Sequence, residues 1–141
     1  MKTLFENRKP GFWLALGAAC VAFIGSIAYL IAYACTADPV TGTWDRVFKW
    51  LVFALMLGGA LISLAGEALR LRFVPVVSIA AYGIGLALHL VETAYPLADV
   101  LTKVPFFGGS PTLAVTFAVL FAITAVVHVI SAFMEHNLQN Q

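Results

Sequence analysis

The segment Ser78–Pro96, with the sequence SIAAYGIGLALHLVETAYP, decides the expected fold because it is apolar enough for lipid yet carries an ordered polar line. The members of this line are spaced three or four residues apart, at Ser78, Tyr82, Gly85, His89 and Glu92. On an α-helix this spacing places them all on one face. A phenol, an imidazole and a carboxylate on one face of a membrane helix must be turned toward other helices or water. The segment therefore predicts a bundle of transmembrane helices.

The composition of the whole chain agrees with this interpretation. Of its 141 residues, 62% are hydrophobic and only 11% are charged, whereas soluble domains are roughly half apolar and about a quarter charged. A hydrocarbon core about 30 Å thick needs about 20 helical residues. Four apolar segments reach this length, at residues 11–35, 47–69, 73–95 and 112–134. We predict an all-α fold in which residues 1–141 form one membrane domain, an antiparallel four-transmembrane-helix bundle.

Two connections refine this prediction. The few residues around Arg70 separate the second helix from the third, so the two helices must be antiparallel neighbours. Tyr95 and Pro96 are expected to close the third helix. Beyond them Leu97, Leu101 and Val104 share a helical face, which predicts a short interfacial helix in the last outer loop.

Basic residues and small residues predict orientation and packing. Five Lys or Arg lie on the side of the termini, at Lys2, Arg8, Lys9, Arg70 and Arg72, against three on the other side, at Arg46, Lys49 and Lys103. Since basic loops favour the cytoplasm, we expect both termini there. On the first helix the stripe Ala15, Ala18, Ala22, Gly25, Tyr29 and Ala32 predicts a packing face. The small residues before Cys35 resemble a cleavage site, but the apolar run is longer than the roughly 7–15 residues of a signal sequence, so we expect an uncleaved helix.

The fourth helix carries a second polar line, which includes Thr124 and His128. We expect both lines to face the bundle interior, and we call their chemically distinctive members the polar seam: Ser78, Tyr82, His89, Glu92, Thr124 and His128. At the inner end of the second helix, Glu67 and Arg70 are three residues apart and are expected to form an ion pair at the level of the headgroups.

His89 and Glu92 are the strongest candidates for chemistry, and two interpretations stay open. They are either coupling groups for a proton or ion, or a structural polar plug. Haem is not expected, because His89 and His128 differ by roughly 15 Å in depth along their helices. No metal site is expected either, because the single His-x-x-Glu pair lacks a second copy. Without a phosphate-binding loop, a paired nucleophile and base, or a basic run, we predict no enzyme, no cofactor and no nucleic-acid partner.

Two stretches carry a resemblance: LFENRKPGFWLALGAACVAFIGSIAYLIAY at Leu4–Tyr33 and FFGGSPTLAVTFAVLFAI at Phe106–Ile123. With its basic start, Gly-Phe-aromatic entry and Gly-Gly turn, the chain resembles small uncharacterised bacterial four-helix integral membrane proteins. The resemblance implies the bacterial plasma membrane and no particular activity. Small multidrug transporters share the size and helix count, but their key acid lies in the middle of the first helix, which has no charge here.

These observations lead to two functional expectations. The first is a non-enzymatic accessory or scaffold subunit of a membrane complex, surrounded by membrane lipids and associated with a second copy or another membrane protein. The alternative is a small oligomeric transporter or ion pathway that uses His89 and Glu92 as coupling groups.

Overall fold

The computed structural model describes residues 10–37, 42–69, 71 and 73–134. Within this part of the chain the secondary structure consists of four α-helices and no strand: α2 (Pro10–Cys35), α3 (Trp50–Leu69), α4 (Val74–Thr102) and α5 (Pro111–Phe133). Each helix is long and apolar enough to cross a membrane. The all-α, multi-pass fold expected from the sequence is therefore confirmed.

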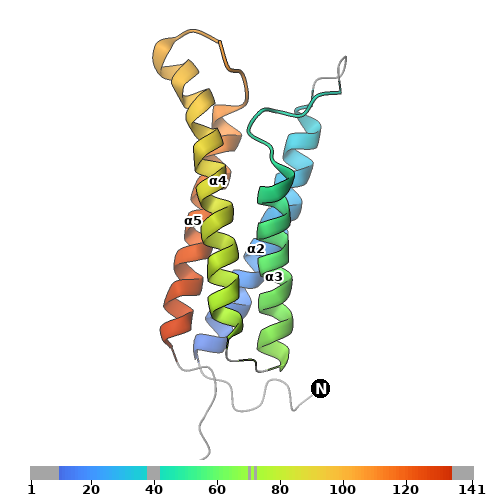
Figure 1. The fold of residues 1–141 in the computed structure, drawn as a ribbon, viewed down its shortest axis with the longest axis vertical. Helices are drawn as coiled ribbons and strands as arrows, with labels where there is room; N and C mark the ends of the chain where they lie inside the picture. The colour runs from blue at the N-terminus through green and yellow to red at the C-terminus, as the bar shows by residue number, and fades with distance from the viewer. Residues whose placement is uncertain (1–9, 38–41, 70, 72, 135–141) are drawn as a thin grey trace, which may run out of the picture.

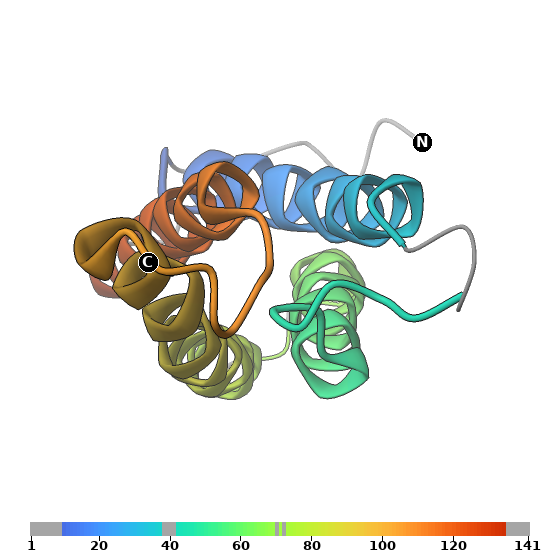
Figure 2. The same ribbon diagram turned by 90° about the horizontal axis from the view of Figure 1, so that it is seen from above.

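The helices form a closed ring (Figures 1 and 2). Each helix packs against its neighbours in sequence, and α2 also packs against α5, which closes the bundle. The first turn of α2 and the last turn of α5 lie at the same end, together with the connection between α3 and α4 (Figure 1). We call this the terminal end, and we call the opposite end, where the two longer connections lie, the loop end.

Small residues set the distance between helices. The predicted packing stripe of α2 faces inward, since Ala15, Ala18, Ala22, Gly25 and Tyr29 are all buried. Large apolar side chains such as Ile24, Val76 and Phe133 point outward instead and are more than half exposed. An apolar exterior around a packed interior suits helices surrounded by lipid.

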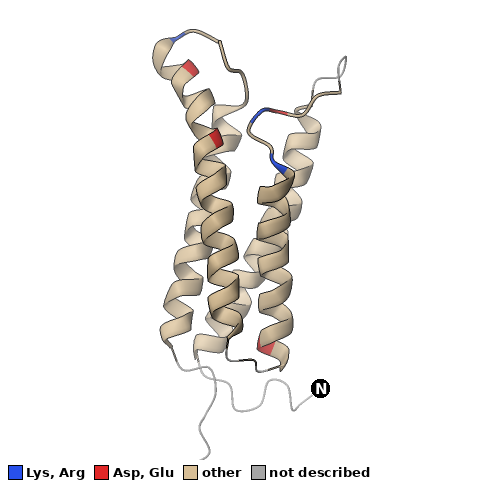
Figure 3. Ribbon diagram, in the orientation of Figure 1, with Lys and Arg blue, Asp and Glu red and all other residues tan. Residues whose placement is uncertain are grey.

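The charged residues that the structure describes are placed toward the two ends of the bundle (Figure 3). Glu67 lies in the last turn of α3 at the terminal end, whereas Asp45, Arg46, Lys49 and the acids of α4 lie toward the loop end. The apolar length between them suits a hydrocarbon core, where an unpaired charge is costly.

The end of α4 differs from the expectation. The helix does not stop at Tyr95 but continues through Pro96 to Thr102, so Leu97 and Leu101 belong to α4 and no separate interfacial helix forms among the described residues of this loop. Pro96 lacks only the hydrogen bond to the carbonyl of Glu92, and one missing bond bends a helix rather than ending it. The helix ends instead at Lys103, whose left-handed φ of 58° turns the chain.

The close contact between α3 and α4 gives a test of the packing. A Cβ on Gly59 would lie 3.0 Å from the Tyr82 ring and 3.1 Å from the Cβ of Ala81, whereas a Cβ on the adjacent Gly58 would meet nothing within 4 Å. We expect Gly59→Leu to lower the free energy of unfolding by about 1–3 kcal/mol through overpacking. Gly58→Leu is the matched control and should leave the thermal unfolding midpoint in detergent near that of the wild type. Equal midpoints for the two variants would contradict this packing.

The buried polar seam as candidate functional site

The structure places five of the six polar-seam side chains inside the bundle. Ser78, Tyr82 and His89 of α4 have no exposed surface, and Thr124 and His128 of α5 are 1% exposed. Glu92 is the exception, because it lies near the loop end and its side chain is 21% exposed. The three-and-four spacing of the sequence thus corresponds to one inward face on each helix.

In the half nearer the terminal end, the seam joins three helices. Ser63 of α3 hydrogen-bonds His128 of α5, with 2.8 Å between Oγ and Nε2. The His128 ring also packs edge-on against Tyr82 of α4, with ring centroids 4.8 Å apart. One turn earlier on α4, the hydroxyl of Ser78 donates to the carbonyl of Gly59, 3.3 Å away. These contacts tie α3, α4 and α5 together where lipid offers no polar partner.

Nearer the loop end, His89 links α4 to α5. Its Nε2 lies 3.0 Å from the carbonyl oxygen of Ala114. Because a carbonyl only accepts, Nε2 carries the proton, and in the neutral ring Nδ1 is then an acceptor. That Nδ1 is buried and has no hydrogen-bond partner among the described residues. The ring packs edge-on against Tyr29 and Phe121, at centroid distances of 5.6 and 5.5 Å, and these two rings also contact each other.

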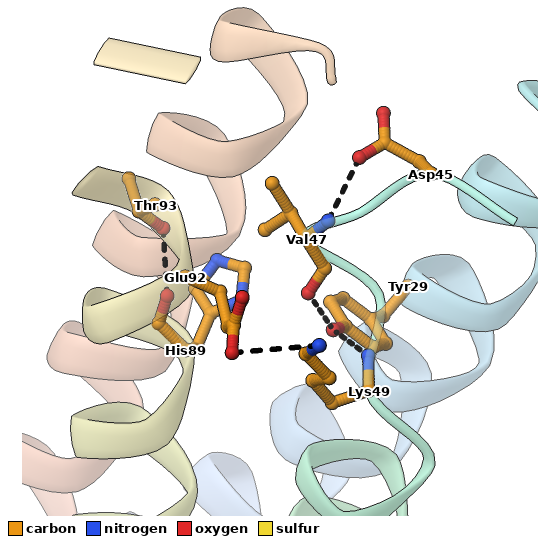
Figure 4. A network of polar contacts seen from close by, with 7 residues as sticks. All are labelled: Tyr29, Asp45, Val47, Lys49, His89, Glu92 and Thr93. Atoms are coloured by element: carbon orange, nitrogen blue, oxygen red, sulfur yellow. Dashed lines mark hydrogen bonds and ion pairs between the residues drawn. The ribbon is translucent and has the colours of Figure 1, made fainter. Parts of the chain in front are cut away.

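Tyr29 of α2 is a member of this network that the sequence did not single out for a polar role. Its hydroxyl accepts from the backbone N–H of Lys49 at 3.1 Å and donates to the carbonyl of Val47 at 3.2 Å (Figure 4). The sequence did indicate that Tyr29 is buried, because the residue belongs to the small-residue stripe of α2 that was expected to face the bundle interior. The partners lie 18 and 20 residues away in a connection, so no local pattern revealed them.

Glu92 forms an ion pair with a residue outside its own helix. Its carboxylate lies 3.4 Å from the ammonium of Lys49, just before α3 (Figure 4). The Lys49 side chain is 45% exposed, so water screens this ion pair. His89 and Glu92 share a helix face but are engaged by different elements, α5 and the α2–α3 connection.

Aromatic rings from α2, α5 and the α2–α3 connection pack together beside His89. Tyr29 packs against Phe117 at 5.2 Å, and Tyr33, one turn further along α2, packs against Phe48 and Phe117 at 5.9 Å each. Tyr33 and Phe117 are at most 5% exposed. We call these four packed rings, Tyr29, Tyr33, Phe48 and Phe117, the aromatic layer.

The two histidines occupy separate levels, as the sequence indicated. His89 contacts Ala114, which lies 14 residues before His128 on α5, a separation of roughly 21 Å along the helix. One iron therefore cannot bind both imidazoles within a protomer. In the described part of the chain, no three His, Cys, Asp or Glu side chains are grouped to hold a metal ion.

The expected inner ion pair is only partly visible. Glu67 lies in the last turn of α3 and is 7% exposed, so its side chain is turned toward the bundle rather than toward the headgroups. Arg70, the expected partner, lies outside the described residues.

Comparison of the chain with protein-family models, with curated protein sequences and with solved structures finds no match. The resemblance to small bacterial membrane proteins therefore stays a prediction, and function has to be argued from the site itself.

Tyr29 and Tyr33 provide a test of the two hydrogen bonds that the Tyr29 hydroxyl makes to the α2–α3 connection. Tyr29→Phe removes a hydroxyl that serves two backbone groups, and leaving such groups without partners costs about 1–3 kcal/mol each when they are buried. We expect a clear loss of thermal stability in detergent. Tyr33→Phe is the matched control, because the buried Tyr33 hydroxyl has no hydrogen-bond partner among the described residues. It should leave stability unchanged or raise it, and a larger loss for Tyr33→Phe than for Tyr29→Phe would refute the network.

Proposed function

We propose that this protein is a non-enzymatic accessory or scaffold subunit of a membrane complex. The observation that carries the proposal is the position of His89, the most promising chemical group of the sequence. Its Nε2 is hydrogen-bonded to the carbonyl of Ala114, and its ring packs edge-on against the Tyr29 and Phe121 rings. An imidazole fixed in this way links helices and has little freedom to exchange protons or bind a substrate.

The rest of the polar seam supports the same role. Ser63, Ser78 and His128 make contacts between helices of one chain, and the hydroxyl of Thr124 donates to the carbonyl of Leu120 within its own helix. Polar groups used in this way stabilise and align a bundle in lipid. What remains for a partner is the apolar exterior.

That exterior contains a place for close helix contact. On α4 the exposed residues Ala80, Gly83 and Ala87 follow one another three and four residues apart, which is helical spacing. A Cβ on Gly83 would meet nothing within 4 Å. Small residues on a lipid-facing surface let another helix approach closely, which supports association with a second copy or with another membrane protein.

The location belongs to the same proposal. We place the chain in the bacterial plasma membrane with both termini in the cytoplasm, because basic residues are more numerous in the segments at that end. The common end of α2 and α5 in the bundle supports termini on one side of the membrane.

Copurification tests the scaffold role. From native membranes solubilised in a gentle detergent, we expect the full chain to retain a stoichiometric membrane-protein partner or a second copy. Gly83→Leu should reduce this retention without lowering the thermal midpoint. The matched control Ile84→Leu exchanges an exposed residue of the same helix and should retain the partner. A wild-type chain that always purifies alone and monomeric would contradict the proposal.

An ion pathway is the second candidate, and one observation favours it. The Nδ1 of His89 is a buried acceptor with no donor among the described residues, and it lies one turn of helix from the partly exposed carboxylate of Glu92.

Proteoliposomes distinguish the two candidates. If the chain is a scaffold, purified protein will move no protons under a pH gradient, and Glu92→Gln will leave its assembly intact because the ion pair with Lys49 is partly exposed. A proton flux in the wild type that Glu92→Gln abolishes, measured with an entrapped pH-sensitive dye, would establish the pathway instead.

A further inference from the structure

The loop end carries a polar depression that the polar seam does not use. It has a volume of about 610 Å³, within the range of roughly 300–1,000 Å³ that is typical of small-molecule sites. It lies between the α2–α3 and α4–α5 connections. Its lining includes Trp44, Asp45 and Arg46 from the first connection and Gly108 and Gly109 from the second.

Two carboxylates hold the walls of this depression in place. Asp45 accepts the backbone N–H of Val47 at 2.9 Å and that of Ser110 at 2.8 Å, and so joins the two connections. Asp99, near the end of α4, accepts the backbone N–H groups of the second connection from Phe106 to Gly108, the shortest at 2.7 Å. Charge-assisted bonds of this kind are about twice as strong as neutral ones, so the walls are preorganised.

Arg46 provides a cation that lies beside two aromatic rings and whose charge also acts on the carboxylate of Asp99. Its guanidinium lies 4.3 Å from the centre of the Tyr95 ring and 5.3 Å from that of Phe107. Stacking on rings uses the faces of the guanidinium and leaves its N–H edge for hydrogen bonds. The Arg46 side chain is exposed, and it forms no ion pair in the part of the chain that the structure describes.

The depth of Arg46 matches the lipid headgroups. Tyr95, on which Arg46 stacks, follows Val74 by 21 residues of continuous helix, which is roughly 32 Å. A hydrocarbon core is about 30 Å thick. With Val74 at one boundary, Tyr95 therefore lies at the other. The exposed rings of Trp44, in the same connection as Arg46, and of Trp50, the first residue of α3, suit this interface.

The lining has both signs of charge at neighbouring positions. Arg46 offers donors to an anion, while Asp45 accepts two backbone N–H groups and still has lone pairs for a third donor, since a carboxylate has about four such sites. Trp44 is 38% exposed beside them, and indole faces attract ammonium groups. We propose that this depression binds the headgroup of a zwitterionic phospholipid, with the phosphate on Arg46 and the ammonium on Asp45 and Trp44.

Native mass spectrometry of the full chain in detergent tests the proposal. The protein is offered equal amounts of phosphatidylethanolamine and phosphatidylglycerol with the same acyl chains. We expect the ethanolamine lipid to be retained in preference, because the glycerol lipid has no ammonium for Asp45. Arg46→Gln should reduce its retention at least about tenfold, the effect of losing one charge-assisted hydrogen bond. Arg46→Lys should retain an intermediate amount, since it keeps the charge but not the planar stack.

The matched control is Lys103→Asn. Lys103 is an exposed cation at the same end that does not line the depression, and asparagine tolerates its left-handed backbone. It should retain the ethanolamine lipid as the wild type does. Equal retention of the two lipids by the wild type would overturn the proposal without any variant, and so would an equal loss for Lys103→Asn and Arg46→Gln.

Free ligands separate a headgroup from an anion site. Phosphoethanolamine should displace the retained lipid at millimolar concentration, whereas inorganic phosphate should not, because it lacks the ammonium. If inorganic phosphate displaces the lipid as well as phosphoethanolamine does, the depression is a simple anion site and the zwitterion assignment is wrong.

Discussion

Hydrocarbon offers no hydrogen-bond partner, and this constraint governs the whole bundle. A membrane helix satisfies its backbone internally, but an imidazole on its surface needs a partner on another helix, whereas a hydroxyl can also bond a carbonyl of its own helix. The bonds from His89 to Ala114 and from Ser63 to His128 meet this need at two levels of the bundle. They restrict the rotation of α4 and α5 about their axes, which in turn decides which apolar faces the lipid meets.

At the loop end this constraint does not apply, because water and lipid headgroups can serve as hydrogen-bond partners there. Lys49, Asp45, Asp99 and Glu92 are used to hold connections rather than helices, and most of their partners are backbone N–H groups or partly exposed charges. Tyr29 connects the buried interior to the polar loop end, because its ring packs in the aromatic layer and its hydroxyl accepts a hydrogen bond from Lys49 just before α3. The interior is therefore fixed by a few buried polar contacts, whereas the exposed charged residues that the structure describes lie toward the loop end.

The end of α4 shows where local sequence signals mislead. Tyr95-Pro96 reads as a stop, because proline cannot donate its backbone bond. The helix nevertheless continues to Thr102, and the carboxylate of Asp99 then holds the following chain against its end. The actual stop depends on a loop that folds back seven to nine residues later. Such a contact has no helical or strand periodicity, so the sequence predicted a separate interfacial helix instead.

The sequence by itself determined the four spans, their antiparallel order and the inward faces of α4 and α5, because apolar length and three-and-four spacing are local properties of a helix. Only the tertiary structure decided the partners: Ala114 for His89, Lys49 for Glu92, and a backbone pair for Tyr29. Helix spacing says which way a side chain points but not which element lies opposite or at what height. Those depend on how the rings and small residues of all four helices pack together.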